Sequence, residues 1–289
     1  MALNEFWQMS TERVEANLAE LYSSHREPQK TLFDAMDYSL LAGGKRLRPL
    51  LVYAFCKLCG GKLEQADQAA MAIEMIHSSS LIHDDLPCMD DDDLRRGKPT
   101  NHKVYGEAMA VLAGDGLLLD ALYVLTVSKL PAETVAELVK TLSYRTGPYG
   151  MVGGQALDME AEERQCTRNE VLAIQKRKTG ALIRAACEMG VLCAGGSYEQ
   201  RAAAGAYADA IGLAFQIRDD VLDATGDAEK LGKPVGTDEN KNTFVKLYGL
   251  DYCRRKIRTL TKQACNALRE FDDPSDLIEL AEYLSSRDH

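Results

Sequence analysis

The sequence predicts an all-α protein in which a single domain is built of antiparallel helices. Two observations support this prediction. The eight prolines leave long proline-free runs, the longest between Pro148 and Pro234, and such runs are typical of long helices. Within them apolar residues recur at the helical spacing, as at Tyr207, Ile211 and Phe215, while no segment alternates with the period of two that marks a strand.

The expected helices cover most of the chain. Each proline lies at an end of an expected helix or between two of them, because a helix interior excludes proline. Two polar loops stand out, at 86–106 and 225–242. No stretch resembles an interdomain linker, so residues 1–289 are predicted to form one domain. The helices are expected at 5–23, 29–41, 48–59, 64–85, 107–128, 132–146, 149–164, 169–194, 199–224, 243–248, 251–270 and 275–285.

Composition and charge exclude several classes of protein. Of the 289 residues 46% are hydrophobic and 27% charged, as in globular proteins. The net charge of −10 argues against general nucleic-acid binding. The most apolar stretch, 108–127, contains Asp115 and Asp120, so we expect a buried helix rather than a membrane span. The N-terminus lacks the basic-then-apolar order of a secretory signal, and we therefore expect a cytoplasmic protein.

The first candidate site is a run of aspartates that follows an apolar helix. Asp84 and Asp85 are followed by Asp90 and three further aspartates at 91–93. Most acidic runs are solvated loops. This one lies within the chain and directly precedes Leu94-Arg95-Arg96-Gly97, so a binding site is the alternative interpretation.

A second acidic cluster lies on the expected helix 199–224. Asp219 and Asp223 continue the apolar four-residue row of that helix, with Asp220 beside them. Because the row is expected to face the interior, and buried carboxylates without a cation are costly, these side chains are expected to bind a cation. Magnesium prefers such oxygen ligands and bridges them to substrate phosphates. Two aspartate clusters that face one cavity would therefore form a magnesium-diphosphate site.

A diphosphate also needs fixed positive charge, which the chain offers at discrete places. Lys45 and Arg48 flank the expected start of a helix, where backbone N–H groups also favour an anion. Each cation alone is more often a surface charge, but together with the aspartates they suggest a site for more than one diphosphate. No Walker loop or Rossmann glycine motif is present. The other candidate cations are Arg95, Arg96, Lys178 with its neighbour Thr179, Lys233 and Lys241.

Four sequence motifs in this order resemble a known family. They are Gly-Gly-Lys-Arg-Leu-Arg-Pro at 43–49, Asp-Asp-x-x-x-x-Asp at 84–90 with Leu-Arg-Arg-Gly at 94–97, Lys-Thr-Gly at 178–180, and Phe-Gln-Ile-Arg-Asp-Asp-x-x-Asp at 215–223. The chain is similar to the short-chain trans-isoprenyl diphosphate synthases, which include farnesyl and geranylgeranyl diphosphate synthases. The resemblance covers nearly the whole chain, from about residue 30 to the end.

The resemblance implies a helical bundle around a deep apolar cavity, usually in a homodimer. It implies condensation of isopentenyl diphosphate with allylic diphosphates (dimethylallyl, geranyl or farnesyl), assisted by three magnesium ions. By similarity, Asp84 and Asp90 bind two ions and Asp219 the third, Asp85, Asp220 and Asp223 support them, and Lys178 acts with them in catalysis. By the same similarity, the allylic diphosphate is bound by Arg95, Lys178, Thr179, Gln216, Lys233 and Lys241, and isopentenyl diphosphate is bound by Lys45, Arg48, His77 and Arg96.

Two questions stay open at this level. The loop 225–242, which contains Gly226, Gly232 and Gly236, is either a lid that excludes water from a carbocation or a simple connection. The alternatives to a synthase are a terpene cyclase of the same fold and a regulatory subunit of a heteromeric synthase. The intact second-diphosphate motif argues against the cyclase, and the presence of both aspartate motifs argues against the subunit.

Product length depends on the residue five positions before Asp84. In this family that residue faces the growing chain, and here it is Ser79, between Ser78 and Ser80. A small residue leaves room for a twenty-carbon product. Met75, one turn deeper, or a bulky residue of 108–127 would close the pocket at fifteen carbons. The sequence leaves both products open.

Overall fold

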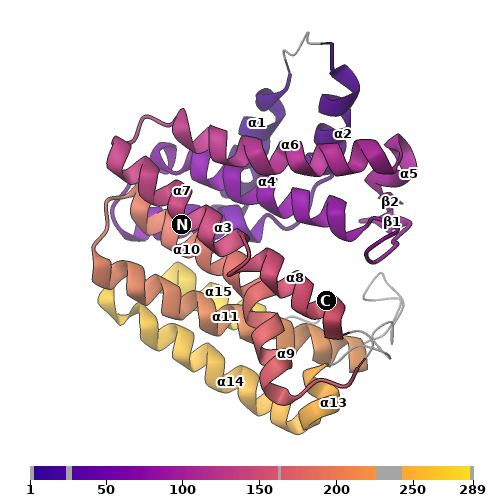
Figure 1. The fold of residues 1–289 in the computed structure, drawn as a ribbon. Coiled ribbons are helices and arrows are strands. Elements are labelled where there is room, and N and C mark those ends of the chain that lie inside the picture. The colour runs from indigo at the N-terminus through magenta and orange to yellow at the C-terminus, as the bar shows by residue number, and fades with distance from the viewer. Residues whose placement is uncertain (1–2, 24–27, 162–163, 226–242, 287–289) are drawn as a thin grey trace.

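The computed structural model describes residues 3–23, 28–161, 164–225 and 243–286 (Figure 1). The predicted all-α class is confirmed, since most of these residues lie in helices. The first half contains α1 (Leu3–Leu21), α2 (Lys30–Leu40), α3 (Leu47–Leu58), η1 (Leu63–Gln65), α4 (Asp67–Asp84), α5 (Asn101–Tyr105), α6 (Glu107–Thr126) and α7 (Ala132–Thr146). The second contains α8 (Met151–Ala161), α9 (Arg168–Gln175), η2 (Lys176–Gly180), α10 (Ala181–Cys193), α11 (Tyr198–Thr225), α13 (Phe244–Tyr248), α14 (Leu250–Ala267), η3 (Leu268–Glu270) and α15 (Ser275–Ser286).

The structure corrects the predicted elements in two places. The loop expected at 86–106 contains α5 and a small antiparallel pair of strands, β1 (Leu94–Arg95) and β2 (Lys98–Pro99), although no strand was predicted. Each strand has two residues, too few for a period of two to be detected. The helix expected over 169–194 is interrupted by η2, a turn of π-helix. Such turns often occur at functional sites.

The helices pack in layers around α10. Figure 1 shows α4 and α6 side by side in the upper part and α11 with α14 in the lower part, and α10 contacts α3, α4, α7 and α11 between them. The row predicted to face inward on α11 does so, because Tyr207 and Ile211 are buried and Phe215 is half-buried. The ring of Tyr207 packs edge-on against Phe55 of α3, with centroids 5.5 Å apart.

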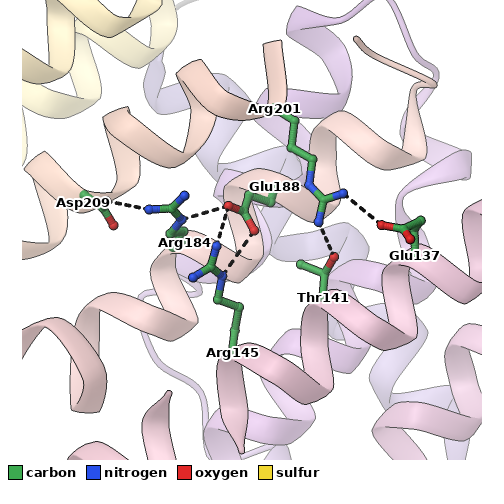
Figure 2. Close-up of polar contacts among 7 residues, drawn as sticks. All are labelled: Glu137, Thr141, Arg145, Arg184, Glu188, Arg201 and Asp209. Carbon is green, nitrogen blue, oxygen red and sulfur yellow. Dashed lines mark hydrogen bonds and ion pairs between the residues drawn. The ribbon is translucent and has the colours of Figure 1, made fainter. Parts of the chain in front are cut away.

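A buried carboxylate ties α10 to its neighbours on two sides (Figure 2). Glu188 of α10, 4% exposed, accepts hydrogen bonds from Arg145 of α7 at 2.9 Å and from Arg184 of α10 at 2.8 Å. Arg184 also donates to Asp209 of α11 at 2.6 Å, and Arg201 of α11 bonds two side chains of α7. These contacts fix the position of α10, whose first turn continues directly from η2.

Helix α6 differs from its prediction as a buried helix. Its inner side packs on α4 and α2, but only 39% of its most apolar 18-residue stretch is buried. Leu112, Leu119 and Tyr123 are exposed by 52%, 63% and 63%. Within the described residues, α6 is the one helix long and apolar enough to cross a bilayer. Length and composition alone are weak evidence for a span, because core helices of soluble proteins share them.

Candidate active site

A cavity of about 690 Å³ lies where α4, α8 and η2 face one another. Polar groups from α3, α4 and η2 meet a lining that is otherwise largely apolar. The lining residues are Arg48, His77, Ser79, Ser80, Leu81, His83, Asp84, Leu86, Cys88, Met89, Val111, Leu118, Met151, Val152, Gln155, Ala156, Met159, Lys178, Thr179 and Leu182.

The first aspartate cluster begins where α4 ends. Asp84 is the last residue of α4 and lines the cavity, and the backbone N–H of Asp90 donates to the carbonyl oxygen of Asp84 at 2.8 Å. This bond folds the loop back toward Asp84, which lines one end of the cavity, whereas Asp90 does not line it. Burial raises the pKa of Asp84 to about 6, with Asp90 adding to the effect and Lys178 opposing it. A cation at this end would therefore relieve a free-energy cost.

Asp85 has a different partner from its neighbour Asp84. It is 3% exposed and accepts a hydrogen bond from Nε of Arg95 at 3.0 Å and a second from the terminal nitrogen of the same guanidinium. That nitrogen also donates to Asp92 at 2.9 Å. Arg95 thus binds two carboxylates in this structure and lies outside the large cavity.

The π-turn η2 presents Lys178 and Thr179 to the cavity. Nζ of Lys178 donates to Asp158 of α8 at 2.6 Å, and Oγ1 of Thr179 donates to Oε1 of Gln216 of α11 at 3.2 Å. Burial lowers the pKa of Lys178, but the carboxylates of Asp158 and Asp84 outweigh it, and the pKa lies above its usual value. The bond from Thr179 ties Gln216 to the π-turn, although Gln216 does not itself line the cavity.

Close packing of α8 on η2 requires a glycine. A Cβ atom at Gly154 would lie 2.2 Å from the backbone nitrogen of Lys178, a distance that no side chain tolerates. Gly154 therefore lets α8 approach the π-turn closely enough for Asp158 to reach Lys178.

Arg48 and His77 form the second cationic part of the cavity. Nε of Arg48 is buried and has no hydrogen-bond partner among the described residues. Burial lowers the pKa of Arg48, and the charge of Arg96 lowers it further while Glu74 opposes the effect. Burial and the charges of Arg48 and Arg96 also lower the pKa of His77 well below its usual value. A neutral imidazole beside a guanidinium whose Nε has no partner among the described residues is suited to bind an anion.

The loop before α3 is shaped by glycines and by Arg96. Gly43 and Gly44 have φ of 80° and 129°, which favour glycine, and a Cβ at Gly44 would lie 2.8 Å from the guanidinium of Arg96. Arg96 donates a hydrogen bond to the carbonyl oxygen of Gly43. Lys45 is exposed in this loop, and its carbonyl oxygen accepts a bond from Trp7 at 2.8 Å. Neither Lys45 nor Arg96 lines the large cavity.

Sequence reasoning missed the role of Arg46, which lies between Lys45 and Arg48. Its side chain is 1% exposed and donates to Glu74 of α4 at 2.7 Å and to the carbonyl oxygen of Leu40 at 2.9 Å. The available signal was Glu74, one acidic residue in the apolar stretch 69–76. Arg46 is therefore the anchor of the loop rather than part of its charged surface.

The second aspartate cluster continues along α11 from Gln216. Asp219, Asp220 and Asp223 follow at helical spacing on the same face. Asp220 is 6% exposed and accepts the backbone N–H of Phe244 at 2.7 Å, so its carboxylate holds the start of α13. Oδ1 of Asp223 is buried with no partner among the described residues. None of the three lines the large cavity in this structure.

The donor set fits magnesium that arrives with a phosphate. In the part of the chain that the structure describes, no three side chains of His, Cys, Asp or Glu converge on one point. Magnesium usually keeps several waters and takes one or two carboxylates together with substrate phosphates. Asp84 at the end of α4 with Asp90 of the turn that follows it, and Asp219 with Asp223 of α11, supply such carboxylates.

The residues predicted to set chain length have different positions. Ser79 is 2% exposed, lines the cavity, and donates to the carbonyl oxygen of Gly114 of α6 at 2.8 Å. Ser80 also lines the cavity and donates to the carbonyl oxygen of His77. Met75 is fully buried and does not contribute to the lining. Lys233, Lys241 and residues 226–242 of the candidate lid lie outside the described residues.

Helix α8 supplies a cavity wall that sequence reasoning missed. Met151, Gln155 and Met159 lie four residues apart and share one face of α8 that lines the cavity. The spacing was visible in the sequence, but nothing local indicated that this face meets the aspartate clusters.

The comparisons with known proteins agree with this architecture. The family model described as Polyprenyl synthetase matches residues 29–284. The chain is 43% identical to a farnesyl diphosphate synthase of Geobacillus stearothermophilus over 295 residues, which cover 100% of this chain and 99% of that protein. It is 47% identical to geranylgeranyl pyrophosphate synthase 3, chloroplastic, of Arabidopsis thaliana, covering 91% and 75% of the two chains.

A solved structure has the same fold. The crystal structure of an FPP/GFPP synthase from Zymomonas mobilis superposes with a TM-score of 0.89 at 39% identity, covering 98% of this chain and 99% of that one. The chain belongs to the polyprenyl synthetase family, and the family resemblance stated from the sequence motifs is confirmed.

Proposed function

We propose that this protein is a trans-prenyltransferase that condenses isopentenyl diphosphate head-to-tail with dimethylallyl, geranyl or farnesyl diphosphate to give farnesyl or geranylgeranyl diphosphate. The observation that carries the proposal is the cavity of about 690 Å³, whose lining joins cationic and acidic groups to a largely apolar wall. An amphiphile with a diphosphate head and a hydrocarbon tail matches that division. The names of the relatives support the same reaction class.

Two groups of residues bind the two substrates, the allylic diphosphate that loses its leaving group and the isopentenyl diphosphate that acts as the nucleophile. Lys178, Thr179 and Gln216 hold the allylic diphosphate, and Lys178 exchanges its bond to Asp158 for one to the phosphate. Arg48 and His77 hold isopentenyl diphosphate, with Lys45 and Arg96 contributing from the adjacent loop. The allylic C–O bond breaks and its electron pair leaves with the diphosphate. The isopentenyl double bond then forms the new C–C bond, and the released diphosphate takes the proton.

Three magnesium ions are proposed to complete the site. Asp84 and Asp90 would hold two and Asp219 the third, with Asp85 and Asp223 supporting them. Bound there, the ions neutralise negative charge that develops on the leaving diphosphate. The raised pKa of Asp84 supports this assignment, because burial disfavours the ionised carboxylate more than the charges of Lys178 and Arg95 favour it.

A homodimer is proposed to cover the outer face of α6. Leu112, Leu119 and Tyr123 lie on that face and are exposed by 52%, 63% and 63%. Contiguous apolar surface of this kind usually marks a protein interface. Burial against a second copy also explains why an apolar helix occurs in a protein for which we propose a cytoplasmic location.

The test is turnover by the purified chain. The protein is incubated with magnesium, isopentenyl diphosphate and each of the three allylic diphosphates, and the products are identified by mass spectrometry. Formation of fifteen- or twenty-carbon diphosphates by the chain alone is expected, and the small Ser79 leaves room for the longer one. Failure to extend any allylic substrate would refute the proposed function.

A further inference from the structure

Gln155 is a polar residue in an apolar wall. Five residues of α8, a helix that the structure describes completely, line the cavity, and the other four are Met151, Val152, Ala156 and Met159. A carboxamide is unexpected in such a row, because burying a polar group without a hydrogen bond is unfavourable.

The amide of Gln155 has no partner in the ligand-free protein. Its Oε1 and Nε2 atoms are both shielded from water, and neither makes a hydrogen bond to a described residue. No hydrogen bond to a described residue therefore holds the amide in its present orientation, and turning it into the cavity breaks none of that kind. A bound ligand is the partner that would satisfy it.

The position of Gln155 places it beside the contact between α8 and Lys178 of η2. Gly154, its neighbour, packs against the backbone of Lys178, and Asp158, three residues on, bonds Nζ of Lys178. The other residues of α8 that line the cavity are apolar. Gln155 thus lies between two residues that contact Lys178, Gly154 and Asp158, and among side chains suited to a hydrocarbon.

We propose that Gln155 is a further catalytic residue whose amide oxygen faces the allylic cation that forms when the C–O bond breaks. This inference rests on the proposed function. The oxygen is the negative end of a neutral dipole and stabilises the developing positive charge without forming a bond to it. A carboxylate at this point would be alkylated by the cation, whereas an amide oxygen is a weak nucleophile. The amide therefore stabilises the cation and leaves it for the isopentenyl double bond.

Gln155→Met separates this role from a structural one. Methionine has a similar length and no amide, so the ligand-free melting temperature is expected to stay the same or rise. The value of kcat with geranyl diphosphate is expected to fall tenfold or more, while KM for both substrates stays within about twofold. The control is Gln263→Met at an exposed position of α14, which should behave as wild type.

Ionisation is measured directly with geranyl diphosphate that carries oxygen-18 in the bridging position, with inorganic diphosphate in place of isopentenyl diphosphate. Scrambling of the label should slow in Gln155→Met by the same factor as kcat. In Gln155→Glu the new carboxylate should capture the cation, forming a C–O ester as diphosphate leaves, which adds one geranyl group to the protein mass.

Several outcomes would overturn the inference. They are an unchanged kcat in Gln155→Met, a fall in melting temperature that accompanies the fall in kcat, a rise in KM for the allylic substrate alone, or ionisation by Gln155→Glu without an ester. Absence of any product from the wild-type protein would instead refute the proposed function, so the two failures are distinguishable.

Discussion

Replacing Arg46 by methionine is expected to destabilise the protein by roughly 3–5 kcal/mol, the usual cost of removing one partner of a buried ion pair. Both partners are shielded from water, since the side chains of Arg46 and Glu74 are 1% and 2% exposed. Without Arg46 the Glu74 carboxylate stays buried and loses its hydrogen-bonded counter-charge, and the carbonyl oxygen of Leu40 loses its donor. Glu15 contributes less, because its side chain is 42% exposed and water screens it.

The expected loss is measurable by thermal unfolding. At roughly 2–4 °C per kcal/mol for a chain of this size, the melting temperature of Arg46→Met should fall by about 10 °C. The double variant Arg46→Met/Glu74→Met replaces the pair by apolar side chains and should recover most of that loss. A melting temperature of Arg46→Met close to wild type, or a double variant less stable than the single one, would refute the reasoning.

Arg48→Met is the matched comparison, two residues along the chain. Nε of Arg48 has no hydrogen-bond partner among the described residues, so its loss should leave the melting temperature unchanged or higher. A charged hydrogen bond to substrate contributes about 1.5–3 kcal/mol, so KM for isopentenyl diphosphate should rise roughly 10- to 100-fold. KM for the allylic substrate should change far less. Equal effects on both substrates would show that Arg48 does not belong to a separate pocket.

Four further predictions concern the metal, the cavity and the interface. Chelation should abolish activity, and added magnesium should restore it. Asp219→Asn should lower activity by about 100-fold or more, since even groups that only support metal ligands are worth 10–100-fold. Retained activity of this variant at saturating magnesium would remove Asp219 from the metal site. The pKa of Asp84 is about 6 against a usual 3.8, so this carboxyl contributes stability below pH 3.8 that is lost as the pH rises through about 6. Asp84→Asn should therefore raise the melting temperature of the metal-free protein above pH 6, by at most the equivalent of about 3 kcal/mol, and should have no such effect below pH 3.8; equal effects at both pH values would contradict burial of the ionised carboxylate as the cause. Ser79→Tyr should shift the product from twenty to fifteen carbons, because overfilling an apolar site costs roughly 1–3 kcal/mol and the longer chain alone bears it; an unchanged product by mass spectrometry would exclude Ser79 from the end of the pocket. Leu119→Asp should convert the proposed dimer to a monomer, measured by light scattering, and a dimer that persists would place the interface elsewhere.

The sequence by itself determined the helices and the kinds of chemical groups at the site. Helix positions follow from local causes, namely proline placement and the spacing of apolar residues, and α7 spans the residues predicted for it. The inward row of α11 was readable for the same reason, because residues four apart on one helix share a face whatever the helix packs against. The motifs likewise indicated the family, because they are runs of neighbouring residues whose order along the chain does not depend on packing.

Only the tertiary structure decided which charges bind one another. Arg46, Arg48 and Arg95 look alike in the sequence, yet one is paired with Glu74, one has no hydrogen-bond partner for its buried Nε among the described residues, and one is bound by Asp85. The partner of a long cationic side chain depends on which helix packs beside it, and for Arg46 that partner lies 28 residues further on. Local periodicity carries no such information.

The sequence alone likewise does not show which apolar faces are covered or which residues line the cavity. An apolar helix such as α6 is predicted to be buried, but its sequence does not state whether its own chain or another covers the face of Leu119. Gln155 was not singled out because a glutamine in a helix is ordinary until both ends of its amide are found buried without a partner among the described residues. Burial and hydrogen bonding are properties of packed elements, so they are decided only when α8, η2 and α4 come together around the cavity.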